Sequence, residues 1–388
     1  MRFPEFTEEW EETTLGKISE ITKGSGISKD QLSEQGSPCI LYGELYTKYK
    51  SEIIDEVYSR TELDSSSLVK SKANDVIIPC SGETAIDIST ARCVPFNNIL
   101  LGGDLNIIRL KHDDGGFFAY QLNGARKKDI ARVAQGVSVV HLYGENLKHI
   151  RVYHPAIEEQ KKITRLLSLI DERIATQNKI IEKLQSLIKG LIDDIITLKC
   201  GQLVAFETLY SKAGEGGTPT TSNTEFYDNG SIPFIKIDDL SNKYLSANKD
   251  YITELGLKKS SAWLIPTHSI IYSNGATIGA ISITKYPVCT KQGILGIVPN
   301  TNIDVEFLYY FMQSSYFQKE VERVVTEGTM KTAYLKDINH IKCPIPDLDR
   351  QKEISHLLSV LSLKEDVERQ LLQKYQIQKQ YLLRKMFI

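Results

Sequence analysis

The sequence has little of what membrane proteins and disulfide-linked proteins carry. Its six cysteines are scattered, with no Cys-x-x-Cys pair and no Cys/His group at zinc-ligand spacing. We therefore expect free thiols in a reducing compartment. The chain lacks an apolar run of about 20 residues, the length of a membrane span, and its first residues, MRFPEFTEEWEE, lack the apolar stretch of a secretory signal. These absences predict a cytoplasmic protein with no membrane partner.

Familiar catalytic motifs are also missing. The sequence holds no GxxxxGK[ST] or GxGxxG loop, no HExxH or GxSxG, and no adjacent prolines, so the Pro-Pro tetrapeptide of amino-methyltransferases is absent. Pro346-Asp347 followed by Asp349 resembles part of a nuclease motif. No acidic-x-Lys follows at a usable spacing, however, and Ala156 stands at the matching place earlier in the chain, so we favour a role at the start of a helix. We expect no catalytic residue, bound cofactor or metal in this chain.

The charge does not by itself favour a nucleic-acid partner. The net charge is −2, and residues 1–146 hold 16 lysines and arginines against 22 acidic residues. Residues 201–341 hold 12 against 14, whereas 147–200 and 342–388 are mildly basic, with 10 against 7 and 9 against 6. A DNA-binding hypothesis must therefore rest on specific residues rather than on a basic surface.

The chain repeats itself with a constant shift of 191 residues. HPAIEEQKKITRLLSLI (154–170) returns as IPDLDRQKEISHLLSVL (345–361), and nine of 24 ungapped positions from 147 to 170 are identical. The identical pairs include His149/His340, Ile150/Ile341, Pro155/Pro346, Gln160/Gln351 and Lys161/Lys352. This period is too long for a solenoid repeat, so we interpret it as a duplicated domain followed by an arm. The two histidines are interpreted as packing or capping groups rather than catalysts.

Weaker similarities lie upstream of each repeat. DVIIPCSGETAI (75–86) resembles SIIYSNGATIGA (269–280), and both patterns predict a buried strand followed by a Ser/Gly-rich turn. Residues 117–136 resemble residues 307–328, and each segment predicts one amphipathic helix that ends at a glycine, Gly136 or Gly328. The order is thus globular segment, helix, globular segment, helix.

Each repeat introduces a long helix. After Pro155 the residues at alternating steps of three and four form a heptad seam with one polar member: Leu167, Ile170, Ile174, Gln177, Ile181, Leu184, Ile188, Leu191 and Ile195. The second arm is less regular, because Glu365, Glu368 and Lys379 fall on its seam. Paired with the first arm, it could form an intramolecular coiled coil. About 35 helical residues would span roughly 50 Å, which suits a spacer between two DNA half-sites and would suit any other rod.

These features resemble a known family. The duplicated Pro…(Glu/Asp)-x-Gln-x-x-Ile segment that starts each long helix is similar to that of type I restriction-modification specificity subunits. GGTPTTSNTEFYDNGSIPFIKIDDL (216–240) and SSAWLIPTHSIIYSNGATIGAISI (260–283) resemble their target-recognition domains, and the resemblance covers essentially the whole chain. The first half departs more, with Lys23-Gly24-Ser25-Gly26 where the second has Gly216-Gly217-Thr218-Pro219, and it lacks the Ile-Pro-Phe stretch.

The resemblance implies an α/β (α+β) fold with two duplicated target-recognition domains and two antiparallel helices that form an intramolecular coiled coil. The implied boundaries are 1–148 and 201–340 for the domains and 149–200 and 341–388 for the helical arms. Each domain would read half of a bipartite double-stranded DNA target, and the arms would set the spacing. Two modification subunits would methylate adenine with S-adenosylmethionine, and restriction/translocase subunits would use ATP and Mg²⁺, so this chain itself would be non-catalytic.

Candidate DNA contacts are polar residues on predicted turns, where amides can pair with adenine, lysines with guanine or phosphate, and Glu with cytosine. In the first domain they are Lys23, Ser25, Tyr42, Glu44, Tyr46, Ser81, Glu83, Thr84, Gln135 and Ser138. In the second they are Thr218, Thr220, Lys236, Asp238, Ser273, Asn274, Thr277, Lys291, Gln292, Thr329 and Lys331. Candidate subunit contacts are Gln160, Lys161, Gln351 and Lys352, for which an ordinary solvated helix face is an equal alternative.

Two other hypotheses remain open from the sequence alone. A coiled-coil scaffold could carry duplicated domains that bind protein or carbohydrate, and an enzyme could use an unrecognised site. The missing motifs disfavour the enzyme. Co-purification separates the rest, since only the specificity-subunit hypothesis requires a stable assembly with a methyltransferase.

Overall fold

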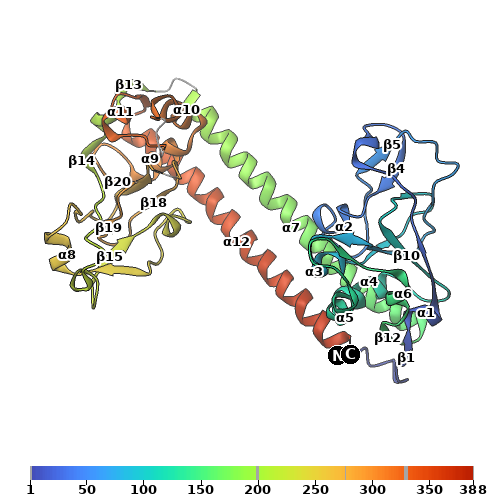
Figure 1. The fold of residues 1–388 in the computed structure, drawn as a ribbon. Helices are drawn as coiled ribbons and strands as arrows, with labels where there is room; N and C mark the ends of the chain where they lie inside the picture. The colour runs from blue at the N-terminus through green and yellow to red at the C-terminus, as the bar shows by residue number, and fades with distance from the viewer. Residues whose placement is uncertain (1, 198–200, 276, 327–330, 388) are drawn as a thin grey trace. The chain divides into compact units, whose positions relative to one another are not determined.

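The computed structural model describes residues 2–197, 201–275, 277–326 and 331–387 (Figure 1). The chain divides into two compact units, one of residues 1–179 with 370–388 and the other of residues 180–369. Each unit contains one globular domain and takes in part of both long helices, α7 (Ile157–Thr197) and α12 (Leu348–Met386). The first unit is therefore built from two separate stretches of sequence, whereas the second is a single stretch.

The elements of the first unit before α7 are β1 (Glu11–Thr14), α1 (Leu15–Ile18), β2 (Ser19–Lys23), the 3-10 helix η1 (Lys29–Gln31), β3 (Leu32–Ser33), β4 (Ser37–Ile40), α2 (Glu44–Thr47), β5 (Ser59–Thr61), β6 (Asp75–Pro79), β7 (Ser81–Gly82), α3 (Ala85–Ile88), β8 (Arg92–Val94), β9 (Leu100–Leu101), β10 (Leu105–Leu110), α4 (Gly115–Asn123), α5 (Lys127–Val133), β11 (Val140–His141), α6 (Gly144–Lys148) and β12 (Arg151–His154).

The elements of the second unit between the long helices are β13 (Gln202–Ala205), η2 (Phe206–Leu209), β14 (Tyr210–Glu215), η3 (Thr224–Phe226), β15 (Ile232–Ile235), η4 (Ile237–Asp239), β16 (Asp250–Ile252), α8 (Glu254–Lys258), β17 (Ile270–Ser273), β18 (Ile281–Ile283), β19 (Cys289–Thr290), β20 (Ile294–Pro299), α9 (Val305–Gln313), α10 (Ser315–Val324), α11 (Leu335–Ile338) and β21 (Lys342–Ile345).

Both domains use the same central sheet. Its strand order is β2-β10-β6-β8 in the first unit and β14-β20-β17-β18 in the second, with all neighbours antiparallel. A second sheet accompanies each, β3-β5-β4-β9 and β16-β15-β19. The central strands β6 and β17 are buried along their whole length, as the apolar runs before each Ser/Gly-rich turn predict. The mixed α/β fold class is thereby confirmed.

The predicted helices of residues 117–136 and 307–328 are each two helices. The first breaks between α4 and α5 at Gly124. In the second, Ser314 ends α9 and caps α10 by accepting a hydrogen bond from the Phe317 amide at 3.1 Å. Helix α5 ends before Ala134, and Gly136 lies beyond it with φ +116°, so its predicted C-cap role is wrong. Gly328 lies outside the described residues.

A strand precedes each long helix, which is why the helices begin later than the predicted arm boundaries. β12 pairs with β1, and β21 pairs with β13, both antiparallel. Gln160 then fastens α7 to its domain: its Oε1 accepts from the Asp114 amide at 2.9 Å and its Nε2 donates to the Pro155 carbonyl at 2.9 Å. Gln351 repeats both bonds, with Asp304 at 2.8 Å and Pro346 at 2.9 Å.

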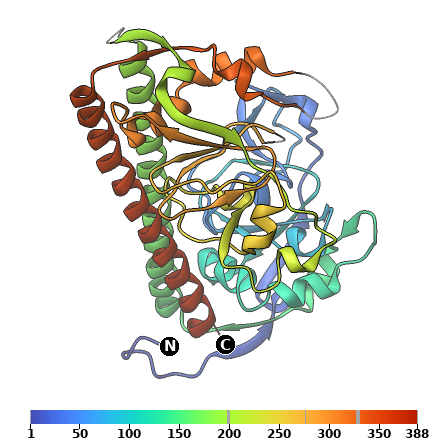
Figure 2. The same ribbon diagram turned by 90° about the vertical axis from the view of Figure 1, so that its left-hand side faces the viewer.

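The long helices α7 and α12 run antiparallel and form the expected intramolecular coiled coil (Figures 1 and 2). In the first unit the start of α7 shares a core with the end of α12, through Leu167, Ile170 and Leu382. In the second unit the end of α7 shares a core with the start of α12, through Ile192 and Leu358. The seam positions of α7 from Leu167 to Leu191 are buried or half-buried, including Gln177, and Ile195 lies outside the described side chains.

The five described cysteines are buried and free. Burial raises the pKa of the Cys39 and Cys80 thiols to about 11, so they behave as small apolar groups. Within the described part of the chain, no helix has the length and apolar character to cross a bilayer.

Candidate nucleic-acid interface

The predicted DNA contacts of the first unit gather where β2 and β6 end and β10 begins. Lys23 is opposite Asn106 and Pro79 is opposite Leu105 in the sheet register. Three backbone hydrogen bonds join the loops that leave this edge. The Gly24 amide donates to Leu105 at 3.0 Å, the Cys80 amide to Asp104 at 2.7 Å, and the Leu142 amide to Cys80 at 2.7 Å. The sheet edge thus holds loops from distant parts of the sequence in one place.

The second unit has three backbone hydrogen bonds at the equivalent positions. The Gly216 amide donates to Ile294 at 2.9 Å, the Asn274 amide to Gly293 at 3.0 Å, and the Ala333 amide to Asn274 at 2.9 Å. These bonds match Gly24 with Gly216, one residue away from the sequence-based match of Lys23 to Gly216. Glycine is required at both places, because an added Cβ would lie 2.0 Å from the Gly102 oxygen in one and 2.3 Å from the Thr290 oxygen in the other.

In the first unit the structure brings three loops together. β7, which contains Ser81, pairs with β11, and the loop before β11 is closed by two hydrogen bonds between Gln135 and His141, of 2.9 and 2.7 Å. The Tyr46 hydroxyl lies 3.6 Å from the place a Cβ would take at Gly82. Lys23, Glu83, Thr84, Gln135 and Ser138 are exposed, and Ser25, Tyr42, Tyr46 and Ser81 are half-buried.

Glu44 is the exception among these candidates. It is only 6% exposed, and its carboxylate accepts from the Leu41 amide at 3.0 Å and from Lys48 at 2.6 Å. Ser59 also donates to it. The side chain is therefore held inside the domain as a structural anchor for α2, a role that replaces the predicted reading of cytosine.

The loop cluster of the first unit has an anionic side. Burial raises the pKa of the Tyr46 hydroxyl, and the nearby Tyr42, Asp87 and Glu83 raise it further. Thr84 caps α3 by accepting from the Asp87 amide at 3.1 Å. Neutral hydroxyls and carboxylates on this side can meet base-edge amino groups, whereas phosphates would be repelled there.

The candidates of the second unit divide by exposure in the same way. Thr220, Lys236, Asp238, Thr277, Lys291, Gln292 and Lys331 are exposed, and Thr218 is half-buried. Ser273 and Asn274 are 0% and 1% exposed, and the Asn274 amide group donates to the Ala333 carbonyl at 3.1 Å. They therefore shape the loops from within and are not presented to a ligand. Lys236 pairs with Asp250 at 2.9 Å, and Thr329 lies outside the described residues.

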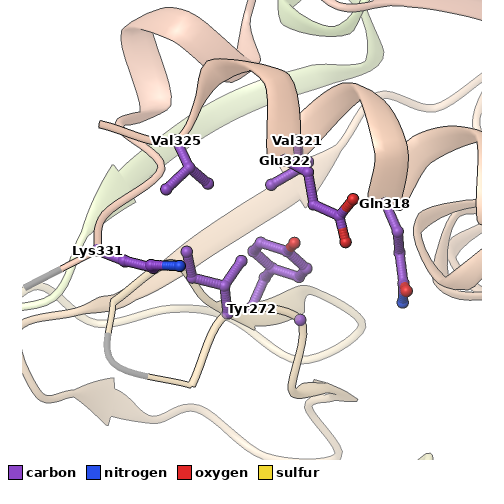
Figure 3. A pocket seen from close by; sticks show the side chains of 8 residues that line it. Tyr272, Gln318, Val321, Glu322, Val325 and Lys331 are labelled. Atoms are coloured by element: carbon purple, nitrogen blue, oxygen red, sulfur yellow. The ribbon is translucent and has the colours of Figure 1, made fainter. Parts of the chain in front are cut away.

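A pocket adjoins this loop region in the second unit. It has a volume of about 340 Å³ and lies between the Tyr272 end of β17 and one face of α10. Figure 3 shows Lys331 on one side of it and Glu322 and Gln318 on the other, with Val321 and Val325 between them. Burial raises the pKa of Tyr272, so its hydroxyl stays neutral. In the part of the chain that the structure describes, no group of three metal-ligating side chains occurs.

Each unit has one exposed tyrosine among its sheet-edge loops that was not singled out from the sequence. Tyr143 and Tyr334 are separated by the 191-residue shift, and both are 46% exposed. Each directly precedes a short helix, α6 or α11, and accepts its first backbone hydrogen bonds. The loop before Tyr143 also exposes Val137 almost completely, at 96%. The repeat itself was the signal that could have found the tyrosines, since both halves place tyrosine at the same position.

The four predicted subunit contacts also differ in exposure. Lys161 and Lys352 are exposed, whereas Gln160 and Gln351 are each only 1% exposed and are bonded within their own units. Neither the solvated face nor the partner contact expected for the glutamines fits this burial. His149 and His340, interpreted from the sequence as packing or capping groups, are both exposed, so neither packs in a core. The capping role is confirmed for His149, which is the C-cap residue of α6, whereas His340 lies one residue beyond the C-cap of α11.

Comparison with known proteins decides the family. The model of the type I restriction modification DNA specificity domain matches residues 7–186 and 210–375, one copy in each half of the chain. The chain belongs to this family. The putative type I restriction enzyme MjaX specificity subunit of Methanocaldococcus jannaschii is 26% identical over 68% of the chain and 64% of its own length. The EcoR124I/EcoR124II specificity subunit of Escherichia coli is 30% identical over 43% of the chain and 42% of its own length.

A solved structure supports the fold over the full length. The crystal structure of the type I restriction-modification S subunit from M. genitalium superposes with a TM-score of 0.63 at 16% identity, covering 100% of this chain and 99% of that one. Two specificity domains and two long helices are therefore the architecture of this family member.

Proposed function

We propose that this chain is the DNA-specificity subunit of a type I restriction-modification complex and that each unit reads one half of a split target. One observation carries the proposal. The same three backbone hydrogen bonds hold the sheet-edge loops in both units, while the exposed polar side chains around them differ. Two readers of two different half-sites need a common scaffold with different donors and acceptors, because each base pair presents its own pattern in the major groove.

The exposed residues suggest a division of labour at this interface. Lys23, Lys291 and Lys331 are exposed, and we expect them to meet phosphates or guanine; the exposed Gln135 and Gln292 can each form two hydrogen bonds with adenine. Because the domains are acidic overall, we expect the isolated chain to bind DNA weakly and with strong salt dependence. Nanomolar specific binding by the isolated chain in physiological salt would contradict this part of the proposal.

The chemistry is assigned to partners. Two modification subunits would supply adenine methylation with S-adenosylmethionine, and restriction subunits would supply ATP-dependent cleavage, so this chain contributes recognition and spacing. Lys161 and Lys352 are exposed, and so are His149 and His340. These two identical pairs lie next to the start of each arm, where a partner that is bound twice would meet the same residues. We assign these pairs to the two modification subunits and leave Gln160 and Gln351 out.

The test is methylation mapping of host DNA by single-molecule sequencing, with the chain co-expressed beside its modification subunit. The expected result is N6-methyladenine in a split motif, with two defined halves around an undefined spacer. Gln135→Ala should relax only one half and Gln292→Ala only the other, while Gln185→Ala, on the exposed side of α7, should change neither. A continuous motif, or relaxation of both halves by one variant, would refute the two-reader proposal.

A further inference from the structure

The first unit holds the end of α12 in a buried cluster of charged groups. The Lys379 ammonium lies 2.6 Å from a carboxylate oxygen of Glu52 and 2.6 Å from one of Asp171. The Tyr120 hydroxyl donates to the other Asp171 oxygen at 2.7 Å. The three charged side chains are only 8–11% exposed. Glu52, Asp171 and Tyr120 thus form a socket, here called the first socket, into which Lys379 of α12 fits.

The second unit has a socket at the equivalent backbone positions. The carbonyl of Glu52 accepts from the Cys93 amide at 2.8 Å, and the carbonyl of Lys243 accepts from the Ile283 amide at 2.8 Å. Two residues later, the Ile54 amide donates to the Cys93 carbonyl at 3.0 Å, and the Leu245 amide donates to the Ile283 carbonyl at 2.9 Å. Glu52 and Lys243 therefore occupy the same place in the two domains, 191 residues apart.

The tyrosine and the arm residues correspond as well. Asp114 and Asp304 cap α4 and α9 at equivalent positions, which matches Tyr120 with Tyr310. Tyr310 contacts Ser362 at 3.0 Å, as Tyr120 contacts Asp171. With the helices in the register fixed by Gln160 and Gln351, Asp171 corresponds to Ser362, and Lys379 corresponds to Ile188. Ile188 packs against the core of the second unit.

The two sockets differ in charge. In the second, the cation Lys243 belongs to the domain itself and is neutralised there by Glu306 of α9, 2.7 Å away. The arms contribute Ser362 and Ile188 to this second socket. In the first, the domain and its own arm supply two carboxylates, and the other arm supplies the cation. Arg92 lies near, but its guanidinium donates to the carbonyls of Leu45 and Tyr49.

We infer that the first socket selects its helix by charge, accepting the end of α12 and rejecting the equivalent end of α7. If the corresponding end of a second α7 entered it, as in a pairing of two first halves, Ile188 would face Glu52 and Asp171. Two buried carboxylates would then lack their ammonium partner, which is strongly unfavourable. The second socket pairs its cation with a carboxylate of the same globular domain, Glu306, and needs only an apolar partner from the arm. This inference does not depend on the role of the protein in DNA recognition.

The test uses the full chain and hydrogen exchange of the backbone amides. Lys379→Ile places in α12 the residue that α7 carries at this position. We expect exchange in residues 370–386 to become faster by on the order of a hundredfold, because one partner of a buried ion pair is lost. Lys374→Ile, at an exposed position of the same helix, is the matched control and should change exchange less than about threefold.

A compensating variant separates charge selection from simple loss of packing. Asp171→Ser, the residue of the second socket, combined with Lys379→Ile leaves Glu52 beside Arg92 without a second carboxylate. We expect this double variant to recover most of the protection that Lys379→Ile loses. Equal exchange in Lys379→Ile and Lys374→Ile would overturn the inference. The inference would also be overturned if the double variant were no better protected from exchange than Lys379→Ile. It would be overturned as well if both variants failed to fold.

Discussion

Asp171 stands between two helices and holds both, since one of its oxygens lies 2.6 Å from Lys379 of α12 and the other accepts from Tyr120 of α4 at 2.7 Å. Burial, and after it the nearby Glu52, raise the pKa of this carboxyl to about 6 against the opposing effects of Lys379 and the Tyr120 hydrogen bond. A single residue thus links the domain, its own arm and the opposite arm within the first unit.

The raised pKa gives a pH-dependent contribution to stability. The folded state holds the Asp171 proton more tightly than the unfolded state, whose pKa is near 3.8. This contribution is therefore largest below pH 4 and is lost as the pH rises to about 6. Asp171→Asn removes the titration, so its melting temperature relative to the parent should be more favourable at pH 7 than at pH 4.5. A difference that stays constant across this range would contradict the assignment.

His154 predicts a dependence of the same sign at higher pH. Its Nδ1 lies 3.1 Å from Asp113, and this hydrogen bond raises the pKa of the imidazole, while the pKa of Asp113 is lowered. The stability that His154 contributes is fully present at pH values just below 6.5, where Asp113 is still ionised, and it is lost as the pH rises through the folded pKa of the imidazole. His154→Gln should cost on the order of 1 kcal/mol at pH 6 and less at pH 9, measured by urea unfolding. His149→Gln, at an exposed position, is the control.

The two buried glutamines predict equal losses in the two units. Gln160→Leu and Gln351→Leu keep the side-chain size but leave the amides of Asp114 and Asp304 without their acceptors. Each should destabilise its own unit by about 1–3 kcal/mol. Chemical denaturation followed by hydrogen exchange would assign the loss to α4 in one variant and α9 in the other. Gln185→Leu, on an exposed face of α7, should change the free energy of unfolding little. An equal loss in this variant would argue against a stabilising role for the hydrogen bonds of Gln160 and Gln351.

Lysine substitutions predict a change in salt dependence rather than in sequence preference. Lys291→Ala in the complex with modification subunits should weaken DNA binding for all sequences and reduce the slope of log K against log salt by about 1. Lys258→Ala, an exposed lysine of α8 paired with Glu254, is the control. If Lys291→Ala instead altered the recognised bases at an unchanged salt slope, Lys291 would contact a base edge rather than a phosphate.

The long helices could be predicted because their signal is local. A heptad seam with a proline at the start requires no knowledge of the domains, and the buried Leu167, Ile170 and Ile181 confirm it. The break between α4 and α5 was missed because the apolar pattern continues across Gly124 although the helix does not. The one-residue error in matching Gly24 to Gly216 arose in the same way, since only the hydrogen bonds to Leu105 and Ile294 define the correspondence.

The candidate interface was predicted only in outline. The turn that follows the buried strand of residues 75–79 placed Ser81 near the sheet edge, but residue type could not distinguish exposed readers from buried supports. Glu44, Ser273 and Asn274 are polar residues on the same loops, yet each is buried. Burial depends on which distant segments cover a loop, and the sequence of the loop does not contain that information.

The duplication, the two long helices and the lack of familiar catalytic motifs could be predicted from the sequence, because repeats, periodicity and motifs are properties of local order along the chain. Which polar residues face outward and which hold each unit together depends on tertiary contacts between distant segments. Lys379 is the clearest case, since on the heptad seam it is a charged residue out of place. In the folded protein it meets Glu52, 327 residues away, and the cost of burying one charge is offset by its partner.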